Sequence, residues 1–275
     1  AEPSVLAGLD TNPRKLINTN LLGSINCLEY ARQKKTRLIF LSSSRVYPIK
    51  PLNDAKHEEL ETRYQWTDNQ EISGINSSGV SESFPLSGFR SFYGSTKLST
   101  EFLINEYIEY YDLEAIINRC SVISGPWQMA KIDQGFVALW LLKHYFQGSL
   151  TYNGYNSKGK QIRDVLHIDD FCDLIDMQTH NFQSYNREIF NIGGGLENTI
   201  SLMELTEICK QLTSNSISII PGEEREADLR LYYTNYEKIN SLNGWKPQKD
   251  IRNILSDIYN WITANEHIYQ YIKDK

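Results

Sequence analysis

The stretch RLIFLSSSRVY at residues 37–47 decides how this chain folds. Its four consecutive apolar residues, 38–41, are typical of a strand covered on both faces, as strands in a parallel sheet are. Ser42, Ser43 and Ser44 follow the apolar run directly. Open α/β folds bind ligands at the carboxyl ends of their strands, so we expect this serine cluster at a site. The alternative is that the serines only satisfy backbone groups of a turn.

A second motif, YGSTK at 93–97, opens a helix expected over about 91–111. In a helix, Tyr93 and Lys97 lie at i and i+4 and share one face. Tyrosine normally titrates near 10, and a neighbouring ammonium would lower its pKa toward the range that suits a general base. YxxxK alone arises often by chance, but a buried strand, a serine cluster and YxxxK in this order do not. We therefore predict that the serine cluster, Tyr93 and Lys97 together form a catalytic set.

Elsewhere the chain alternates between helical and extended patterns, which predicts an α/β fold with a mainly parallel sheet. The long polar segment 45–90 has little periodicity and is expected to be a functional loop. We expect Thr11 or Asn12 to cap the first helix, and Asp169 or Asp170 to cap a short helix. Further helices are expected over about 13–32 (with Ile17, Leu21, Ile25 and Leu28 on one face), 134–147, 201–212 and 250–264. Further strands are expected over 114–120, 161–166, 187–192 and 216–220.

Composition excludes several classes of function. The formal net charge is −6 and the basic residues are scattered, which argues against a nucleic-acid-binding face, although a few local arginines could hold an anionic small molecule. The apolar run 136–142 is too short to span a membrane, and no charged-then-apolar leader opens the chain. Four cysteines without CxxC spacing predict no metal site and buried, reduced thiols, as in a cytoplasmic protein.

Six segments, taken in order, resemble the landmarks of the extended short-chain dehydrogenase/reductase family of NAD-dependent nucleotide-sugar epimerases and dehydratases. They are SSSRVY (42–47), YGSTK (93–97), NRCSVISGP (118–126), GKQIRDVLHIDD (159–170), FNIGG (190–194) and READLR (225–230). The resemblance implies a Rossmann-type doubly wound parallel sheet, NAD as cofactor, and a smaller C-terminal α/β lobe for the nucleotide sugar. The implied domains are 1–127, with 161–192 contributing, and 128–275.

Within this family, ETRY (61–64), DQG (133–135) and GKQIRDVLH (159–167) resemble CDP-paratose/CDP-tyvelose 2-epimerase-like proteins. That likeness implies epimerisation of a nucleotide-activated deoxysugar through transient hydride transfer and a keto intermediate, and a possible homodimer. A 4-epimerase or a dehydratase is the alternative. Dehydratases carry Asp-Glu directly after the catalytic Ser/Thr, where this chain has Ser44 and Arg45, which disfavours dehydration.

The resemblance also assigns roles residue by residue. Ser43 polarises the substrate oxygen, Tyr93 is the general acid/base and Lys97 holds the nicotinamide ribose. The residues assigned to the cofactor are Asn20, Ser42, Tyr93 and Lys97. The residues assigned to the nucleotide sugar are Arg163, Arg225, Asp228, Tyr152 and Asn153, with the two arginines gripping the diphosphate.

The sequence departs from the family in two ways. Val122 and Ser124 replace an Asn and a Tyr, which puts cofactor and diphosphate contacts of that loop in doubt. AEPSVLAGLDTNP at 1–13 resembles the segment after the fourth strand, and no GxxGxxG occurs, so the first βαβαβ portion of the NAD-binding domain is expected to be missing. We interpret Gly193, Gly194 and Gly195 as a turn rather than a phosphate loop. The third reading of the chain is a non-catalytic, truncated nucleotide-sugar-binding fragment.

Overall fold

The apolar run after Arg37 forms a strand at the edge of a parallel sheet. The structure is a computed structural model that describes residues 12–130, 134–225 and 228–269. Strand β1 (Leu38–Ser43) pairs in parallel with β6 (Ala115–Cys120), which pairs in parallel with β10 (Ile189–Ile192). The α/β fold with parallel strands is thus confirmed.

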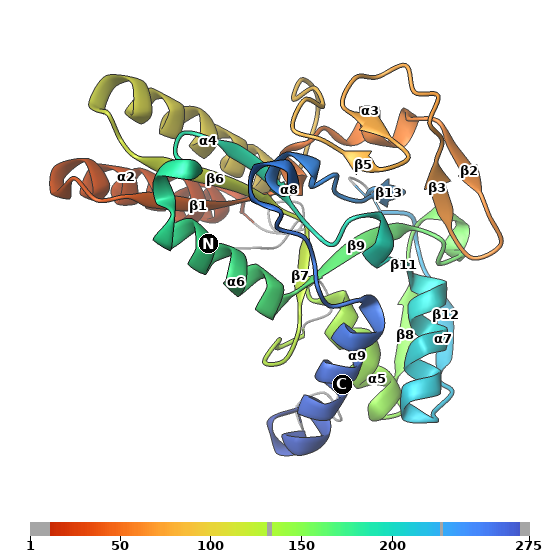
Figure 1. The fold of residues 1–275 in the computed structure, drawn as a ribbon. Helices are drawn as coiled ribbons and strands as arrows, with labels where there is room; N and C mark the ends of the chain where they lie inside the picture. The colour runs from red at the N-terminus through yellow and green to blue at the C-terminus, as the bar shows by residue number, and fades with distance from the viewer. Residues whose placement is uncertain (1–11, 131–133, 226–227, 270–275) are drawn as a thin grey trace.

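The remaining elements alternate along the chain, as Figure 1 shows. The α-helices are α1 (Pro13–Ile17), α2 (Gly23–Lys34), α3 (Ile49–Asp54), α4 (Phe92–Tyr111), α5 (Phe136–Tyr145), α6 (Ile168–His180), α7 (Leu202–Thr213), α8 (Glu237–Asn243) and α9 (Ile251–Ala264). The π or 3-10 turns are η1 (Asn18–Leu22), η2 (Ser44–Val46), η3 (Tyr155–Ser157), η4 (Phe182–Ser184), η5 (Leu196–Asn198) and η6 (Glu266–Tyr269). The other strands are β2 (His57–Glu59), β3 (Tyr64–Trp66), β4 (Ile75–Asn76), β5 (Gly79–Val80), β7 (Val122–Ser124), β8 (Ser149–Tyr152), β9 (Ile162–His167), β11 (Thr199–Ser201), β12 (Ser218–Pro221) and β13 (Leu231–Tyr232).

Helices cover both faces of the first sheet at its central strand β6. The edge strand β1, for which the apolar run predicted such cover, is only partly buried, and its Leu41 is 43% exposed. Ala115 and Ile117 of β6 pack with residues of α2 and α4, which lie side by side in Figure 1. Ile116, between them, packs with residues of α6. Successive strand residues point to opposite faces, so this alternation places one helical layer on each side of the sheet.

A second sheet carries the chain from this layer into the C-terminal half. Its central strand β9 pairs in parallel with β7 and β13 and antiparallel with β11, and β8 pairs separately with β12. Residues of α5, α7 and α9 form a hydrophobic core with β8 and β9. The division into lobes at residue 127 stays a prediction.

The first helix forms where predicted, but the face it buries is different. Asn12 caps it, accepting from the backbone N–H of Arg14, and Pro13 opens it. Residues 18–22 are π-helical, and the wider turn rotates the side chains that follow. Leu28 is buried as expected, whereas Ile17, Leu21 and Ile25 are half-buried.

The predicted acidic cap of the helix after residue 168 is wrong. His167 caps α6: its Nδ1 accepts from the backbone N–H of Asp169 at 3.0 Å, and the helix runs for 13 residues. Asp170 instead accepts from the backbone N–H groups of Gln248 and Lys249. This carboxylate therefore ties α6 to the segment that leads into α9.

The segment 45–90 is more ordered than a long polar loop was expected to be. It contains α3 and the two hairpins β2–β3 and β4–β5. Trp66, Val80 and Phe84 are buried in it and pack with Tyr232 and Tyr233. The segment is held by its own aromatic core, so its order does not require a ligand.

Searches for other kinds of site found little in the described part of the chain. No helix among the described residues is long and apolar enough to cross a membrane. Those residues also hold no group of three or more side chains suited to a metal ion. All four cysteines are free, but Cys27 and Cys172 are exposed, so burial holds for Cys120 and Cys209 alone.

Candidate functional site

Ser43 and Tyr93 meet at the carboxyl end of β1. Ser43 is the last residue of the strand and pairs in register with Cys120, the last residue of β6. Tyr93 lies in the first turn of α4, which Ser91 caps by accepting from the backbone N–H of Gly94. The hydroxyl of Ser43 lies close enough to the phenol of Tyr93 to lower its pKa as a hydrogen-bonding partner. The sequence prediction that this serine and this tyrosine come together describes the observed geometry.

The ionisation of Tyr93 differs from the prediction. Burial raises the pKa of Tyr93, while the Ser43 hydrogen bond and the positive charge of Arg45 lower it by less. The ammonium of Lys97 donates to the backbone oxygen of Leu41 at 2.7 Å and lies over the ring of Phe40. The expectation that Lys97 lowers the pKa of Tyr93 is therefore corrected: the cation that acts on the phenol is Arg45.

Ser42 is committed to a buried network behind the site. Its hydroxyl donates to Glu101 of α4 at 2.5 Å, and Arg119 of β6 binds the same carboxylate through Nε and Nη2. Arg119 also donates to the hydroxyl of Tyr47, which donates to Asn191 of β10. This network fastens α4 to the three strands of the sheet. The Ser42 side chain points into it, and its predicted contact with the cofactor is untested.

Asn20 lies on the π-helical turn and faces α4. Its side chain is buried and donates to the hydroxyl of Thr96 at 3.4 Å. Thr96 in turn donates to the backbone oxygen of Tyr93. Asn20 thus supports the turn that carries the catalytic tyrosine, and its predicted contact with the cofactor stays a prediction.

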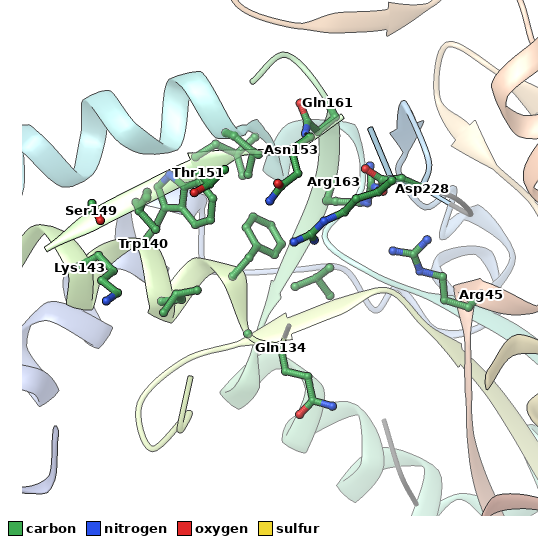
Figure 2. A pocket seen from close by; sticks show the side chains of 18 residues that line it. Arg45, Gln134, Trp140, Lys143, Ser149, Thr151, Asn153, Gln161, Arg163 and Asp228 are labelled. Carbon is green, nitrogen blue, oxygen red and sulfur yellow. The ribbon is translucent and has the colours of Figure 1, made fainter. Parts of the chain in front are cut away.

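A cavity of about 580 Å³ opens beside this corner, and Figure 2 shows its lining. Four of the five residues predicted to bind the nucleotide sugar line it: Asn153, Arg163, Arg225 and Asp228. The guanidinium of Arg163 donates to the carboxylate of Asp228 at 2.9 Å, and both side chains are largely buried. The structure therefore brings together residues that come from β9 and from the segments before β13.

Tyr152 is placed differently from its prediction. It is buried in the hydrophobic core, where its ring stacks on Trp140 and its hydroxyl is hydrogen-bonded to Thr206. It is not among the described residues that line the cavity. Successive residues of an extended chain face opposite ways, so Asn153 reaches the cavity and Tyr152 does not.

The glycines at 193–195 form a turn in which backbones approach closely, as interpreted from the sequence. A Cβ on Gly194 would lie 2.1 Å from the backbone oxygen of Val165. The backbone N–H of Gly195 donates to the buried carboxylate of Asp164. This close approach explains why glycine is needed here without any phosphate.

The cavity lining also includes polar residues that were not predicted as site residues, among them Arg45, Lys143 and Gln161. Arg45 had served only as a sign against dehydration. Its position two residues after Ser43 was the available signal, since a side chain there follows the strand end directly. Gln161 lies in the quoted segment GKQIRDVLHIDD (159–170), which was the signal for it. Lys143 carries no motif, and only the packing of α5 brings it to the cavity.

Comparisons with known proteins identify the family of the chain. The family model described as "NAD dependent epimerase/dehydratase family" matches residues 6–193. CDP-paratose 2-epimerase of Salmonella typhi is 29% identical over 260 residues, 92% of this chain and 73% of that protein. The structure of DesIV, a dTDP-glucose 4,6-dehydratase of Streptomyces venezuelae, superposes with a TM-score of 0.78 at 23% identity, covering 98% of this chain and 72% of that one. UDP-glucose 4-epimerase of Thermotoga maritima superposes with a TM-score of 0.77 at 20% identity, covering 97% and 76%. The chain belongs to the NAD-dependent epimerase/dehydratase family.

Proposed function

We propose that this chain is an NAD-dependent epimerase of a nucleotide-activated deoxysugar, similar to CDP-paratose/CDP-tyvelose 2-epimerases. The observation that carries the proposal is the proximity of Ser43 and Tyr93 at the end of β1, beside a cavity lined by Arg163 and Arg225. The Ser43 hydroxyl can bind a sugar hydroxyl next to the phenol of Tyr93, and the deprotonated phenol can then take the proton from that sugar hydroxyl. Guanidinium groups suit the diphosphate that activates such a sugar.

The residues at the strand end fit the nicotinamide part of NAD. Lys97 has three N–H donors and gives one of them to the oxygen of Leu41, which leaves donors for the hydroxyls of a ribose. Lys97 and the phenol of Tyr93 share one face of α4 at the mouth of the parallel sheet, where such folds bind dinucleotides. Bound NAD would supply the acceptor and later the donor of the hydride, so that the reaction has no net redox change.

Each protein residue then has a definable task. Tyr93, as tyrosinate, takes the proton from the sugar hydroxyl and later returns it, and Ser43 donates a hydrogen bond to the same oxygen while it is a carbonyl. Arg163 and Arg225 hold the diphosphate, and Asp228 orients Arg163. The ketone is planar at the reacting carbon, so turning the sugar within the cavity exposes its other face before reduction.

The test is turnover of defined substrates. The intact parent protein, supplied with NAD, should convert CDP-paratose to CDP-tyvelose, detected as an equilibrium mixture by NMR. Conversion of UDP-glucose to UDP-galactose would replace this proposal with a 4-epimerase, and a 4-keto-6-deoxy product from dTDP-glucose would replace it with a dehydratase. Nucleotide-sugar binding without any conversion would support the non-catalytic alternative.

We further propose that the chain forms a homodimer through α2 and α4. These adjacent helices, with the η1 turn that precedes α2, expose large apolar side chains, namely Leu22, Tyr30, Phe92, Phe102 and Tyr110. Apolar surface of this kind is stabilised when a second copy covers it. Light scattering after size exclusion should give twice the chain mass of 31.8 kDa, and Phe102→Glu should give the monomer. A monomeric parent chain would contradict the proposal.

A further inference from the structure

Arg45 occupies the boundary between the catalytic corner and the cavity. It lies in η2, directly after β1, and its backbone N–H donates to the hydroxyl oxygen of Ser43 at 3.2 Å. The first turn of α4 packs on its backbone: a Cβ on Gly94 would lie 2.0 Å from the oxygen of Arg45. The backbone of Arg45 is therefore fixed relative to Ser43 and to the first turn of α4, which carries Tyr93.

The guanidinium of Arg45 extends from this anchor into the cavity. Figure 2 shows it turned toward Arg163 and Asp228. Its Nη1 is shielded from solvent and has no hydrogen-bond partner among the described residues. Burial and the charge of Arg163 together lower the pKa of Arg45 to about 10, so the group stays cationic at neutral pH. A buried charged donor without an acceptor is costly, so a site that retains one is suited to a ligand that brings the acceptor.

The charges around the cavity identify the class of that acceptor. The described lining residues include four cationic side chains, Arg45, Lys143, Arg163 and Arg225, and one carboxylate, Asp228. Arg163 already holds that carboxylate. The excess of positive charge suits a ligand with more than one negative charge, and the diphosphate of a nucleotide sugar is such a group.

The position of Arg45 decides which of the two phosphates it would meet. Arg163 and Asn153 lie farther along the cavity than Arg45 does, as Figure 2 shows, and Arg225 also lines this cavity. Arg45 lies on the side of the catalytic corner, where the sugar must be if its hydroxyl is to reach Tyr93. The phosphate on that side is the one that carries the sugar.

We propose that Arg45 binds the sugar-proximal phosphate of the nucleotide sugar and thereby fixes which ring carbon faces Tyr93. This inference rests on the proposed function and deepens it. The backbone of Arg45 is held at Ser43 and at the first turn of α4. A phosphate bound by its guanidinium therefore sets the position of the sugar relative to Tyr93.

Comparing cytidine mono- and diphosphate tests the contact, because CMP lacks the phosphate in question. Titration calorimetry on the chain should show CDP binding more tightly than CMP. In Arg45→Met the Kd of CDP should rise about 10- to 100-fold, the loss expected for one charge-assisted phosphate contact, while the Kd of CMP changes by less than about 3-fold. The matched control is Arg187→Met, which removes an arginine paired with Asp112 at 2.6 Å on the surface and should leave both affinities unchanged.

The outcomes separate the two proposals. An unchanged ratio of CMP to CDP affinity in Arg45→Met would overturn the role of Arg45 while leaving the proposed function intact. If the parent chain binds none of CDP, UDP and dTDP, the proposed function fails, and the inference falls with it. Circular dichroism checks folding. If Arg45→Met does not fold, Arg45→Gln keeps a polar side chain of similar reach, and a parental ratio in that variant would equally overturn the role of Arg45.

Discussion

Arg119 lies in β6, and Arg45 directly follows the neighbouring strand β1. The surroundings of these two buried arginines differ in how they satisfy the guanidinium. The side chain of Arg119 is 4% exposed and that of its partner Glu101 is 2% exposed. Glu101 also accepts a hydrogen bond from Ser42, and Arg119 also donates one to the hydroxyl of Tyr47. Arg45 is sealed at Nη1 but has no acceptor there among the described residues. The first arginine holds the sheet together, and the second keeps its hydrogen-bonding capacity for a ligand.

The difference follows from what burial does to a charge. Desolvation costs several kcal/mol per ion, and only a partner with good geometry offsets it. Arg119 has that partner within the chain, and the carboxylate raises the pKa of its guanidinium despite burial. Burial lowers the pKa of Arg45, since nothing in the described chain compensates it to the same extent. Stability and binding therefore reside in different arginines, which variants can separate.

The largest expected effect is on the catalytic corner itself. Tyr93→Phe removes the proton-transferring hydroxyl and should lower kcat about 10²- to 10⁴-fold, the usual contribution of a general acid/base. Turnover of CDP-paratose measures it. Tyr110→Phe alters an exposed tyrosine on the same helix and should retain full activity. Near-parental turnover of Tyr93→Phe would eliminate the mechanism.

The role of Arg119 should be measurable as a contribution to the free energy of unfolding. Glu101→Ala leaves Arg119 as an unpaired buried charge, which typically costs about 3–5 kcal/mol in the free energy of unfolding. Urea denaturation measures this loss. Glu207→Ala breaks an exposed pair with Lys210 and should cost less than about 1 kcal/mol. Equal losses in the two variants would show that the buried network does not stabilise the sheet.

The ligand-binding side should show the reverse pattern. Arg163→Met removes a guanidinium that lines the cavity, and the Kd for CDP should rise about 10-fold or more. Its effect on unfolding should be smaller than that of Glu101→Ala, because the Arg163–Asp228 pair keeps some contact with solvent. If Arg163→Met lowers the free energy of unfolding but leaves the CDP affinity unchanged, Arg163 has a structural role, like Arg119, and does not bind the ligand.

The smallest effect concerns pH. Tyr93 must be deprotonated to act as a base, and burial raises its pKa, so kcat/KM should increase as pH rises above neutrality. Arg45 lowers the pKa of this phenol, so its removal raises that pKa and reduces the tyrosinate present at any given pH. The rise of kcat/KM with pH should therefore occur at higher pH in Arg45→Met than in the parent, by about one pH unit or less. If kcat/KM rises over the same pH range in Arg45→Met and in the parent, Arg45 does not act on the ionisation of Tyr93.

The sequence by itself determined most of the longer strands and helices and the elements that carry the predicted catalytic residues. The apolar run at 38–41 specified the strand β1, and the i, i+4 spacing of Tyr93 and Lys97 specified their shared face on α4. These features are local: a strand or helix fixes them within a few residues. The serine at the strand end followed from the same pattern.

Only the tertiary structure decided which charge each side chain meets. It turned Lys97 toward the oxygen of Leu41, placed Arg45 beside Tyr93, and buried Tyr152 while Asn153 reached the cavity. The partners in these contacts come from segments far apart in the chain, and no local pattern records their meeting. Electrostatic interactions depend on distance and desolvation, so they are settled only when the folded segments pack.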